Sequence, residues 1–512
     1  MSRRFRALFG SSIFRFISVC LLFTAAISLP PASHYLTGGM AAAGVPTQRA
    51  SSDANYGIPI GGDRGTPERA GELLAGPRRE SRLVDDDKPH TLVASFYDVE
   101  SFTSAKLLLN NKDIVAREIR PTLYGEDGGM LEIAPVTVEP NSFQMVDLKE
   151  WAALGGMGFR RGSIRLFHTG KDLVIGSEVY LEDDQRSLNF EEKLHEIGTF
   201  DSRRLEGVMY IPTQTTEAKL IISNAGEASV NVTAKFSRMP REDGDTQTIL
   251  LLPHQTKVVD LTGQIEDPAE GGAIGISITH DGDESSLLAR ALVYDSEKGY
   301  SMAGALENPS SKKSSELHGA GFKLESAGDE KLKPVVVVRN VGESVSAVKA
   351  NIPYMRRDGT TDTITLPTVR LRAGEIGLID MRKVSKTVEA EEIATAGLEI
   401  SYDTEPGSII ADVQSIGENV SQVYGMMLWD VMSHRSSTGG YPFYIEGTST
   451  TRAYIKNGTD REMDYVTYLT YGNGEQYMIG LRALAAHQTV EIDVKAIRDN
   501  QIPDETGKVL PI

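Results

Sequence analysis

Apolar and polar residues alternate along most of the chain beyond about residue 90, and four stretches repeat one order of elements. Each stretch opens with an apolar strand that ends in Asn and closes with a strand that ends in Asp before an aliphatic residue. The Asn-terminated strands are Ala105–Asn110, Ala218–Asn224, Val335–Asn340 and Ala453–Asn457. Their asparagines are 114, 116 and 117 residues apart. A period of about 115 residues with strand-type alternation predicts tandem β-sandwich domains.

A tight-turn dipeptide lies between the two ends of each stretch. Asp-Gly and Asn-Gly favour the positive φ angles of a two-residue hairpin, so each dipeptide predicts a hairpin turn. The dipeptides are Asp127-Gly128, Asp243-Gly244, Asp358-Gly359 and Asn473-Gly474, and the closing aspartates are Asp147, Asp260, Asp380 and Asp493. Helix is expected only around Trp151 and over Val388–Ala396.

Two further strands are expected to close each of the first three copies. They are Ser163–Phe167 with Leu173–Tyr180, Ala273–Thr279 with Leu287–Tyr294, and Gly397–Tyr402 with Ile409–Ile416. The predicted fold is all-β, with tandem immunoglobulin-like antiparallel β-sandwich domains, three complete and one partial. The predicted divisions are a signal peptide or N-terminal anchor (1–43), a disordered spacer (44–89), and repeats at 90–196, 203–309, 316–433 and 439–512.

The fourth copy has too few residues after Asp493 for a closing pair of strands: 19, against 33 from Asp147 to Tyr180. We interpret the chain as an incomplete fragment. The alternative is a last domain with an unpaired edge that another strand could fill.

The N-terminal residues are typical of an export signal. Arg3, Arg4 and Arg6 precede an apolar run, and Ala41-Ala42-Ala43 suits cleavage. An uncleaved membrane anchor is the alternative. The only cysteine, Cys20, lies inside this run. A mature chain without thiols excludes disulfides, thiolate metal sites and a cysteine nucleophile, so its domains must be stabilised by core packing alone.

The charge balance excludes one class of partner. The formal net charge of −18 becomes about −22 once the four arginines of the signal are removed. A chain this acidic repels nucleic acid and anionic lipid surfaces. No catalytic motif of the serine-elbow, phosphate-loop or zinc-protease type occurs, so we expect no enzyme activity.

Candidate ligand residues are few. The densest acidic group comprises Asp243, Asp245, Asp281 and Asp283, weak calcium candidates in two turns; no other cofactor is expected. His254 and His487 occupy equivalent positions, filled by Asn141 and Gly374 in the other copies, which indicates a turn rather than a metal ligand. The fourth copy also contains a local concentration of tyrosines, and we expect most of them to pack in the core. They are Tyr465, Tyr468, Tyr471 and Tyr477.

The third copy carries a family resemblance. The segment Val335–Gly342, the Asp358-Gly359 turn and Leu371–Gly374 resemble the bacterial cell-adhesion-related (CARDB-like) domains, which are immunoglobulin-like sandwiches. Leu220–Gly226 has the same opening. The resemblance implies an extracellular, cell-surface or periplasmic role without catalysis.

These observations predict an exported, structural or adhesive array of domains whose partners are proteins or glycans at the cell surface. Membrane contact is expected only through an uncleaved N-terminal segment. The alternative function is a carbohydrate-binding accessory protein, which an exposed row of aromatic side chains would favour.

Overall fold

The computed structural model describes residues 87–140, 142–183, 185–186, 188–239, 242–261, 272–321, 332–381, 393–417, 423–426, 428–432, 452–470 and 476–510. The predicted signal (1–43), nearly all of the predicted spacer (44–89) and the Asn473-Gly474 turn lie outside the described residues. Within these ranges no helix is long and apolar enough to cross a membrane.

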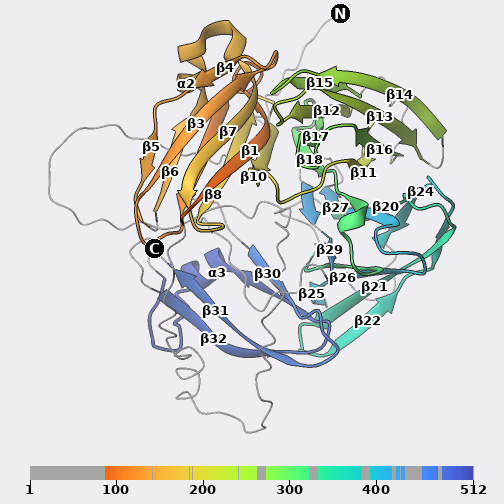
Figure 1. Ribbon diagram of the computed structural model, residues 1–512. Helices are drawn as coiled ribbons and strands as arrows, with labels where there is room; N and C mark the ends of the chain where they lie inside the picture. Colours follow the sequence, from red (N-terminus) through yellow and green to blue (C-terminus); the bar gives the residue numbers. More distant parts are fainter. Residues whose placement is uncertain are drawn as a thin grey trace, which may run out of the picture.

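The fold is all-β, as predicted, and its strands pair antiparallel in sheets that pack in pairs (Figure 1). The first sheet pair joins the sheet β10-β1-β7-β3-β4, with β5 beside β3, to the sheet β6-β2-β8-β9. Its strands are β1 (Lys88–Asp98), β2 (Ser104–Asn111), β3 (Arg117–Gly125), β4 (Met130–Glu132), β5 (Val136–Val138), β6 (Ser142–Asp147), β7 (Arg161–Gly170), β8 (Ile175–Asp183), β9 (Leu188–Lys193) and β10 (His195–Glu196).

The second sheet pair joins β11-β16-β13-β14 to β15-β12-β17-β18. Its strands are β11 (Arg204–Ile211), β12 (Glu217–Asn224), β13 (Val230–Arg238), β14 (Glu242–Leu251), β15 (Thr256–Asp260), β16 (Gly272–His280), β17 (Leu287–Asp295) and β18 (Tyr300–Ala305).

The third sheet pair joins β22-β21-β26-β19-β29, with β23 and β25 beside β21, to β24-β20-β27-β28. Its strands are β19 (Glu316–Gly319), β20 (Leu332–Asn340), β21 (Ser346–Arg356), β22 (Thr361–Thr365), β23 (Val369–Leu371), β24 (Ile376–Asp380), β25 (Ile393–Ala396), β26 (Leu398–Tyr402), β27 (Ile409–Gly417), β28 (Val423–Met426) and β29 (Trp429–Asp430).

The fourth sheet pair consists, in its described residues, of two two-stranded sheets. They are β30 (Arg452–Lys456) with β33 (Thr489–Asp493), and β31 (Met463–Thr470) with β32 (Gln476–Leu484). The described helical segments are α2 (Leu148–Gly155), η1 (Gly156–Phe159), η3 (Pro309–Ser311) and α3 (Val494–Asp499).

Alternation along each strand fixes which face is buried. In β12, Leu220 and Ile222 point inward and are fully buried against Ile276 and Ile278 of β16. The same period of two sends Lys219, Ile221 and Ser223 to the opposite, outer face of that sheet.

The interiors of the sheet pairs are not all separate. The largest cluster of the first pair extends into the second, where it includes Ile221, Leu292 and Tyr294 from the outer face of β12 and β17. A smaller cluster joins the second and third pairs through Val208, Val337 and Ile410, among others. Part of the apolar packing therefore lies between the sheet pairs.

The closing strands of the first three copies are confirmed as β7 with β8, β16 with β17, and β26 with β27. The helix around Trp151 is confirmed as α2, which Asp147 caps by accepting a hydrogen bond from the Lys149 backbone N–H at 2.8 Å. Asp493 caps α3 in the same way, accepting from Ala496 N at 2.9 Å. The helix expected over Val388–Ala396 is wrong in its described part, because Ile393–Ala396 pairs with β21 as β25.

Two predicted turns behave as expected and one does not. Gly128 and Gly359 adopt φ of 87° and 84° in hairpin turns. Asp243-Gly244, in contrast, lies inside β14, at a β-bulge in which Gly244 and Asp245 together face Phe236 of β13. The paired part of this hairpin extends to Arg238 and Glu242.

Candidate functional site

The weak calcium candidates are separated by the length of a strand. Asp281 accepts from the backbone N–H and the side-chain amide of Asn231, each at 2.7 Å, near the start of β13. Asp243 pairs with Ser237 near its end. These two β13 positions are six residues apart, a distance of about 20 Å along a strand. In the described ranges no three histidine, cysteine or acidic side chains form a group that could hold a metal ion. The structure does not bring the four candidates together.

The repeated asparagine makes the same pattern of hydrogen bonds in all four sheet pairs. Its side-chain amide donates to the carbonyl four residues later and to carbonyls 27–31 residues later, while its Oδ1 accepts the backbone N–H two residues later. The residues are Asn111, Asn224, Asn340 and Asn457, at most 5% exposed. We call this arrangement the Asn clamp.

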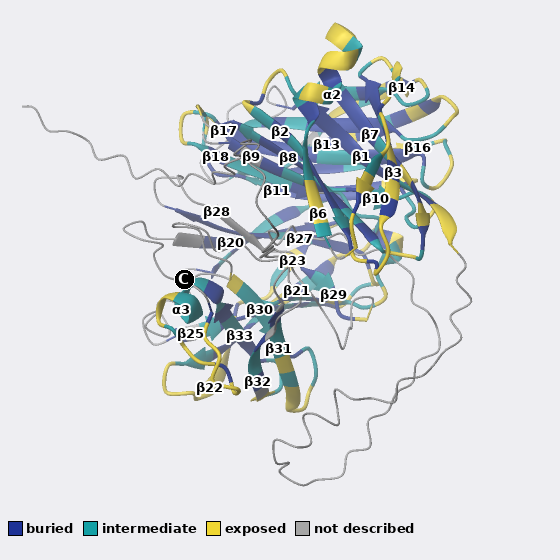
Figure 2. Cartoon of the chain, turned by 90° about the vertical axis from the view of Figure 1, so that its left-hand side faces the viewer, coloured by how far each residue is buried: buried dark blue, intermediate teal, exposed yellow. Residues whose placement is uncertain are grey.

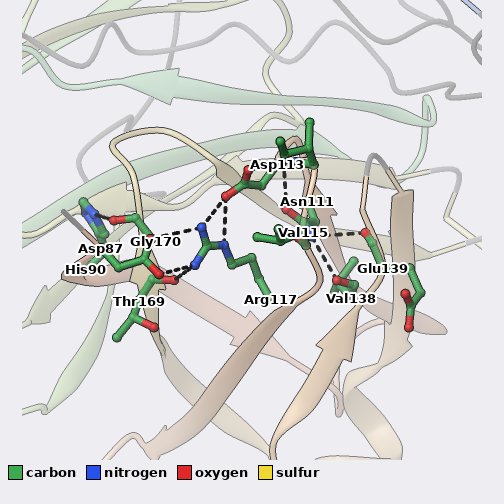
Figure 3. Close-up of polar contacts among 11 residues, drawn as sticks. Asp87, His90, Asn111, Asp113, Val115, Arg117, Val138, Glu139, Thr169 and Gly170 are labelled. Atoms are coloured by element: carbon green, nitrogen blue, oxygen red, sulfur yellow. Dashed lines mark hydrogen bonds and ion pairs between the residues drawn. The ribbon is translucent and has the colours of Figure 1, made fainter. Parts of the chain in front are cut away.

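The first clamp corrects the sequence prediction by one residue, from Asn110 to Asn111. Figure 3 shows Asn111 donating to Val115, Val138 and Glu139. Its Oδ1 accepts from Asp113 N at 2.9 Å. Asn110 points to the opposite face of β2 because adjacent residues of a strand face opposite sides.

An ionic cluster lies beside this clamp (Figure 3). The buried Arg117 donates to Asp87 at 2.7 Å and 3.1 Å and to Asp113 from Nε at 2.9 Å. The hydrogen bond with Arg117 lowers the pKa of both carboxyls, and the bond with Asp87 raises the pKa of Arg117. All three groups satisfy one another, so the cluster holds the start of β1 against β3.

The residue just before each clamp asparagine reaches the preceding sheet pair. Ser223, Arg339 and Lys456 occupy this position in the second, third and fourth pairs, on the outer face of the sheet. Each makes a polar contact with the pair before it. We call these three contact regions the first, second and third joints.

The first joint is apolar at its centre. Ser223 Oγ donates to Ser95 O at 2.6 Å, and the ring of Tyr294 meets Phe190 edge to face at 6.0 Å between centroids. At its rim, Arg165 donates to Glu227 at 3.1 Å and to Ala225 O at 2.8 Å.

Ionisable side chains are also buried in the first joint. Glu192 accepts from the backbone N–H groups of Ser95 and Phe96 at 2.8 Å and 3.2 Å, and burial raises its pKa. Burial, together with the nearby Glu178, raises the pKa of Glu191 to about 7, and Arg290 opposes this shift. Burial in turn lowers the pKa of Arg290.

The second joint is built around a buried arginine. Arg339 Nη1 lies 3.1 Å from Glu206 Oε2 and donates to Gly207 O and Ile276 O at 3.2 Å and 2.9 Å. Both charged side chains are nearly inaccessible, at 8% and 5% exposed. A side chain in place of Gly275 would overlap the Arg339 guanidinium arm, so a glycine is needed there.

The third joint, like the second, places a carboxylate on the preceding sheet pair and a cation on the following one. Lys456 Nζ lies 2.9 Å from Glu399 Oε1, and His487 Nδ1 lies 2.9 Å from the same oxygen. Burial lowers the pKa of Lys456 while Glu399 opposes that shift. Burial works against the ionised Glu399, but Lys456 together with the nearby His318 and His487 outweighs burial and brings the pKa of Glu399 below its ordinary value. A side chain at Gly321 would overlap the ring of Tyr454, which packs across this joint.

The turn interpretation of the two equivalent histidines agrees with their backbone. His254 and His487 adopt φ of 59° and 61°, and Gly374 at the same position of the third pair adopts 77°. The left-handed conformation of this turn also aims both imidazoles across a joint. His254 stacks on Tyr124 at 4.2 Å between ring centroids, and His487 bridges Glu399 and Asp460 at 2.9 Å each.

Of the tyrosines of the fourth pair, Tyr477 is 3% exposed and donates its hydroxyl to Ile502 O at 2.9 Å. Tyr465 and Tyr468 are half-buried, and Tyr471 lies outside the described residues. A cavity of about 30 Å³ lies in the first joint between Phe96, Phe190 and Tyr294. That volume holds a water molecule or two, far less than the several hundred Å³ of a typical small-molecule site.

Sequence reasoning did not single out the joint residues. The available signal was their position: Ser223, Arg339 and Lys456 each precede the clamp asparagine, and they differ from one another in charge. Because their side chains differ in chemistry, the shared position is recognised only from the contacts between the sheet pairs.

Comparison with known proteins adds little. No family model matches the chain, and no curated protein matches it. One solved structure with partial similarity is a calcium-binding mutant of beta-glucuronidase 2 from Bacteroides uniformis. It is 10% identical over 51% of this chain and 28% of that chain, with a TM-score of 0.12. A TM-score this low supports no argument about fold or activity.

Proposed function

We propose that this chain is an exported, non-enzymatic array of β-sandwich domains with a structural or adhesive role at the cell surface. The four sheet pairs are copies of one CARDB-like unit, with domains at 90–196, 203–309, 316–433 and 439–512. The observation that carries the proposal is the set of three joints, in which the same strand position contacts the preceding pair each time.

The joints favour an array with fixed angles between its domains over a flexible string of domains. Contacts between domains of one chain are ordinarily polar and permit relative motion. Here a hydrophobic cluster and a nearly inaccessible Arg339–Glu206 pair lie between the second and third pairs. Such joints fix the angle between domains, so that loops and sheet edges are presented at set distances, where sandwiches bind their partners.

A carbohydrate-binding role receives no comparable support. Among the described tyrosines of the fourth pair, Tyr477 is buried and its hydroxyl is satisfied by the backbone. Tyr477 therefore does not contribute to an exposed aromatic row, and we favour the array.

The proposal is tested in the source cells with a deletion strain. We expect an impermeant biotin reagent to label the protein on intact cells, and deletion to reduce attachment of the cells to one another or to a surface. Complementation with Arg339→Met should fail, since it breaks the second joint, whereas Arg120→Met should succeed because Arg120 is 64% exposed in a surface pair with Glu118. Protein found only in the cytosol, or unchanged attachment after deletion, would contradict the proposal. Binding of the purified chain on a glycan array would favour the carbohydrate-binding alternative.

A further inference from the structure

The second joint contains a carboxyl group, that of Asp412, on the face of β27 that meets the second sheet pair. Strand β11 of the second pair lies against β27, and both strands are mostly buried (Figure 2). Val413 faces the interior of the third pair and is fully buried there. The period of two therefore turns Ile410, Asp412 and Gln414 toward the second pair, and Ile410 belongs to the cluster that joins the two pairs.

Asp412 takes part in none of the ion pairs of this joint. Arg339 pairs with Glu206 at 3.1 Å, and Lys312 pairs with Glu307 at 2.5 Å. Among the described residues, no lysine, arginine or histidine side chain lies within ion-pair distance of Asp412, and the charge that acts on it is that of Glu307, another carboxylate. An ionised Asp412 is therefore an uncompensated negative charge inside the joint.

Two buried polar atoms near Asp412 lack a hydrogen-bond partner. They are Gln414 Oε1 and Tyr300 Oη. Gln414 is fully buried and donates from Nε2 to Asp412 Oδ2 at 2.5 Å. Tyr300 belongs to β18 of the second pair, and burial together with the nearby charge of Asp412 raises its pKa. Because a carboxylate only accepts hydrogen bonds, an ionised Asp412 cannot satisfy Gln414 Oε1.

A proton on Asp412 would relieve both defects. A protonated carboxyl group carries one O–H donor, and Gln414 offers an unpartnered acceptor on the amide that already donates to this carboxyl group. The proton also removes the uncompensated charge. Burial raises the pKa of Asp412 from 3.8 to about 6, so the group takes up its proton in mildly acidic solution.

The other ionisable groups that face this region do not compete for that proton. Tyr300 and Tyr210 are phenols, which ordinarily titrate near pH 10, and Arg339 remains a cation at all these pH values. Glu307 is already in an ion pair. Of these groups, Asp412 is the one expected to change its charge between about pH 5 and 7.

We propose that the second joint is a proton-controlled hinge, in which a protonated Asp412 favours the closed joint and an ionised Asp412 favours its opening. In the closed joint β11 packs on β27, which fixes the angle between the second and third sheet pairs. In the open joint water reaches the carboxylate, and the two pairs move independently. The inference rests on the fixed joints of the proposed array and adds their regulation: the array is more rigid in acid than at neutral pH.

The direction and size of the effect follow from linkage. The closed joint holds the proton more tightly than the open joint, in which the pKa of Asp412 returns to its ordinary value of 3.8. The ratio of open to closed joints therefore rises with pH, by about tenfold between pH 5 and 7, and levels off above pH 7.

The rate of thiol labelling measures this opening. The purified full chain carries Cys20→Ser and one new cysteine, Val208→Cys, at a position that is 3% exposed and belongs to the joint cluster. At each pH the rate is divided by that of Thr248→Cys, at an exposed position of β14, which removes the pH dependence of the thiolate itself. We expect the normalised rate to rise about tenfold between pH 5 and 7.

Two carboxyl variants assign the effect to one residue. Asp412→Asn keeps the shape of the side chain and supplies an N–H donor without a charge, so it should hold the normalised rate at its pH 5 value throughout. Glu405→Gln removes an exposed carboxyl group from a loop of the same sheet pair and should leave the tenfold rise intact.

Three outcomes would overturn the proposal. The first is a normalised rate at Val208→Cys that does not change between pH 5 and 7. The second is a rise that persists in Asp412→Asn. The third is an equal rise for Val232→Cys, at a fully buried position inside the second pair, because that result shows unfolding of a domain instead of opening of the joint. These measurements use purified protein, so a failure here leaves the cell-attachment experiment unaffected.

Discussion

Replacing Asn111 with alanine tests whether the Asn clamp, rather than the neighbouring Asn110, holds the first sheet pair together. Asn111 is fully buried and makes four hydrogen bonds. The bonds to Val138 O and from Asp113 N are buried, and the other two are partly buried. Asn110 lies on the opposite face of β2, where it is partly exposed, and Asn110→Ala is therefore the matched control.

The magnitude follows from these bonds. A buried backbone group left without a partner costs about 1–3 kcal/mol, and a partly buried one less because water reaches it. Two groups of each kind give a loss of about 4 kcal/mol for Asn111→Ala. The change at Asn110 should cost less than about 0.5 kcal/mol, as for an ordinary surface substitution.

The assay must follow each sheet pair by itself, because unfolding of a chain with several domains is not a two-state process. Pulsed hydrogen exchange at increasing urea, with peptides from β3 and β7 as the readout, gives a midpoint for the first pair. With a slope of about 1.5 kcal/mol per molar urea, Asn111→Ala should lower that midpoint by about 2–3 M. An unchanged midpoint for Asn111→Ala, or an equal decrease for Asn110→Ala, would refute the clamp.

Four further outcomes are expected. Arg339→Met removes the partner that Glu206 has across the joint and leaves this nearly inaccessible carboxylate with Arg204 of its own sheet pair, so small-angle scattering should show an expanded chain, and adding Glu206→Gln should restore the compact particle. Glu191 has a pKa raised from 4.5 to about 7, so the folded chain binds more protons than the unfolded chain in that window and stability falls as pH rises through it; Glu191→Gln should flatten the urea midpoint measured across that range. His254→Val places a β-branched residue at φ of 59° and should destabilise the second pair by about 1–2 kcal/mol in urea, whereas His254→Gly should not strain the turn. Calcium should leave the melting temperature unchanged in calorimetry, because the four weak candidates are divided between the two ends of β13, and a clear rise would refute that reasoning.

Much of the fold was predictable from alternation alone, because a strand with one buried face has a side-chain period of two. The closing strands and the turns at Gly128 and Gly359 followed from this pattern and from turn chemistry. The choice of Asn110 was wrong although the phase of the pattern contained the answer. Asn111, not Asn110, is in phase with the buried Leu107 and Leu109.

Other features depended on tertiary structure. Asp243-Gly244 has the local chemistry of a turn, but strand pairing places it inside β14, at a bulge of that strand. The sequence predicts a helix that includes residues 393–396, yet pairing with the edge of β21 places them in a sheet. Local propensity is a weak preference that pairing with a neighbouring strand overrides.

The sequence by itself determined the succession of strands along the chain, the turns at Gly128 and Gly359, and the alternation of buried and exposed positions, since these depend on residues close together in the chain. Only the tertiary structure decided what covers the outer faces. Ile221, Arg339 and Lys456 lie at polar-face positions by their period, and their burial depends on contacts with the preceding sheet pair, which lies outside their own repeat. Such contacts leave no local pattern, because any side chain that complements its partner can occupy the position.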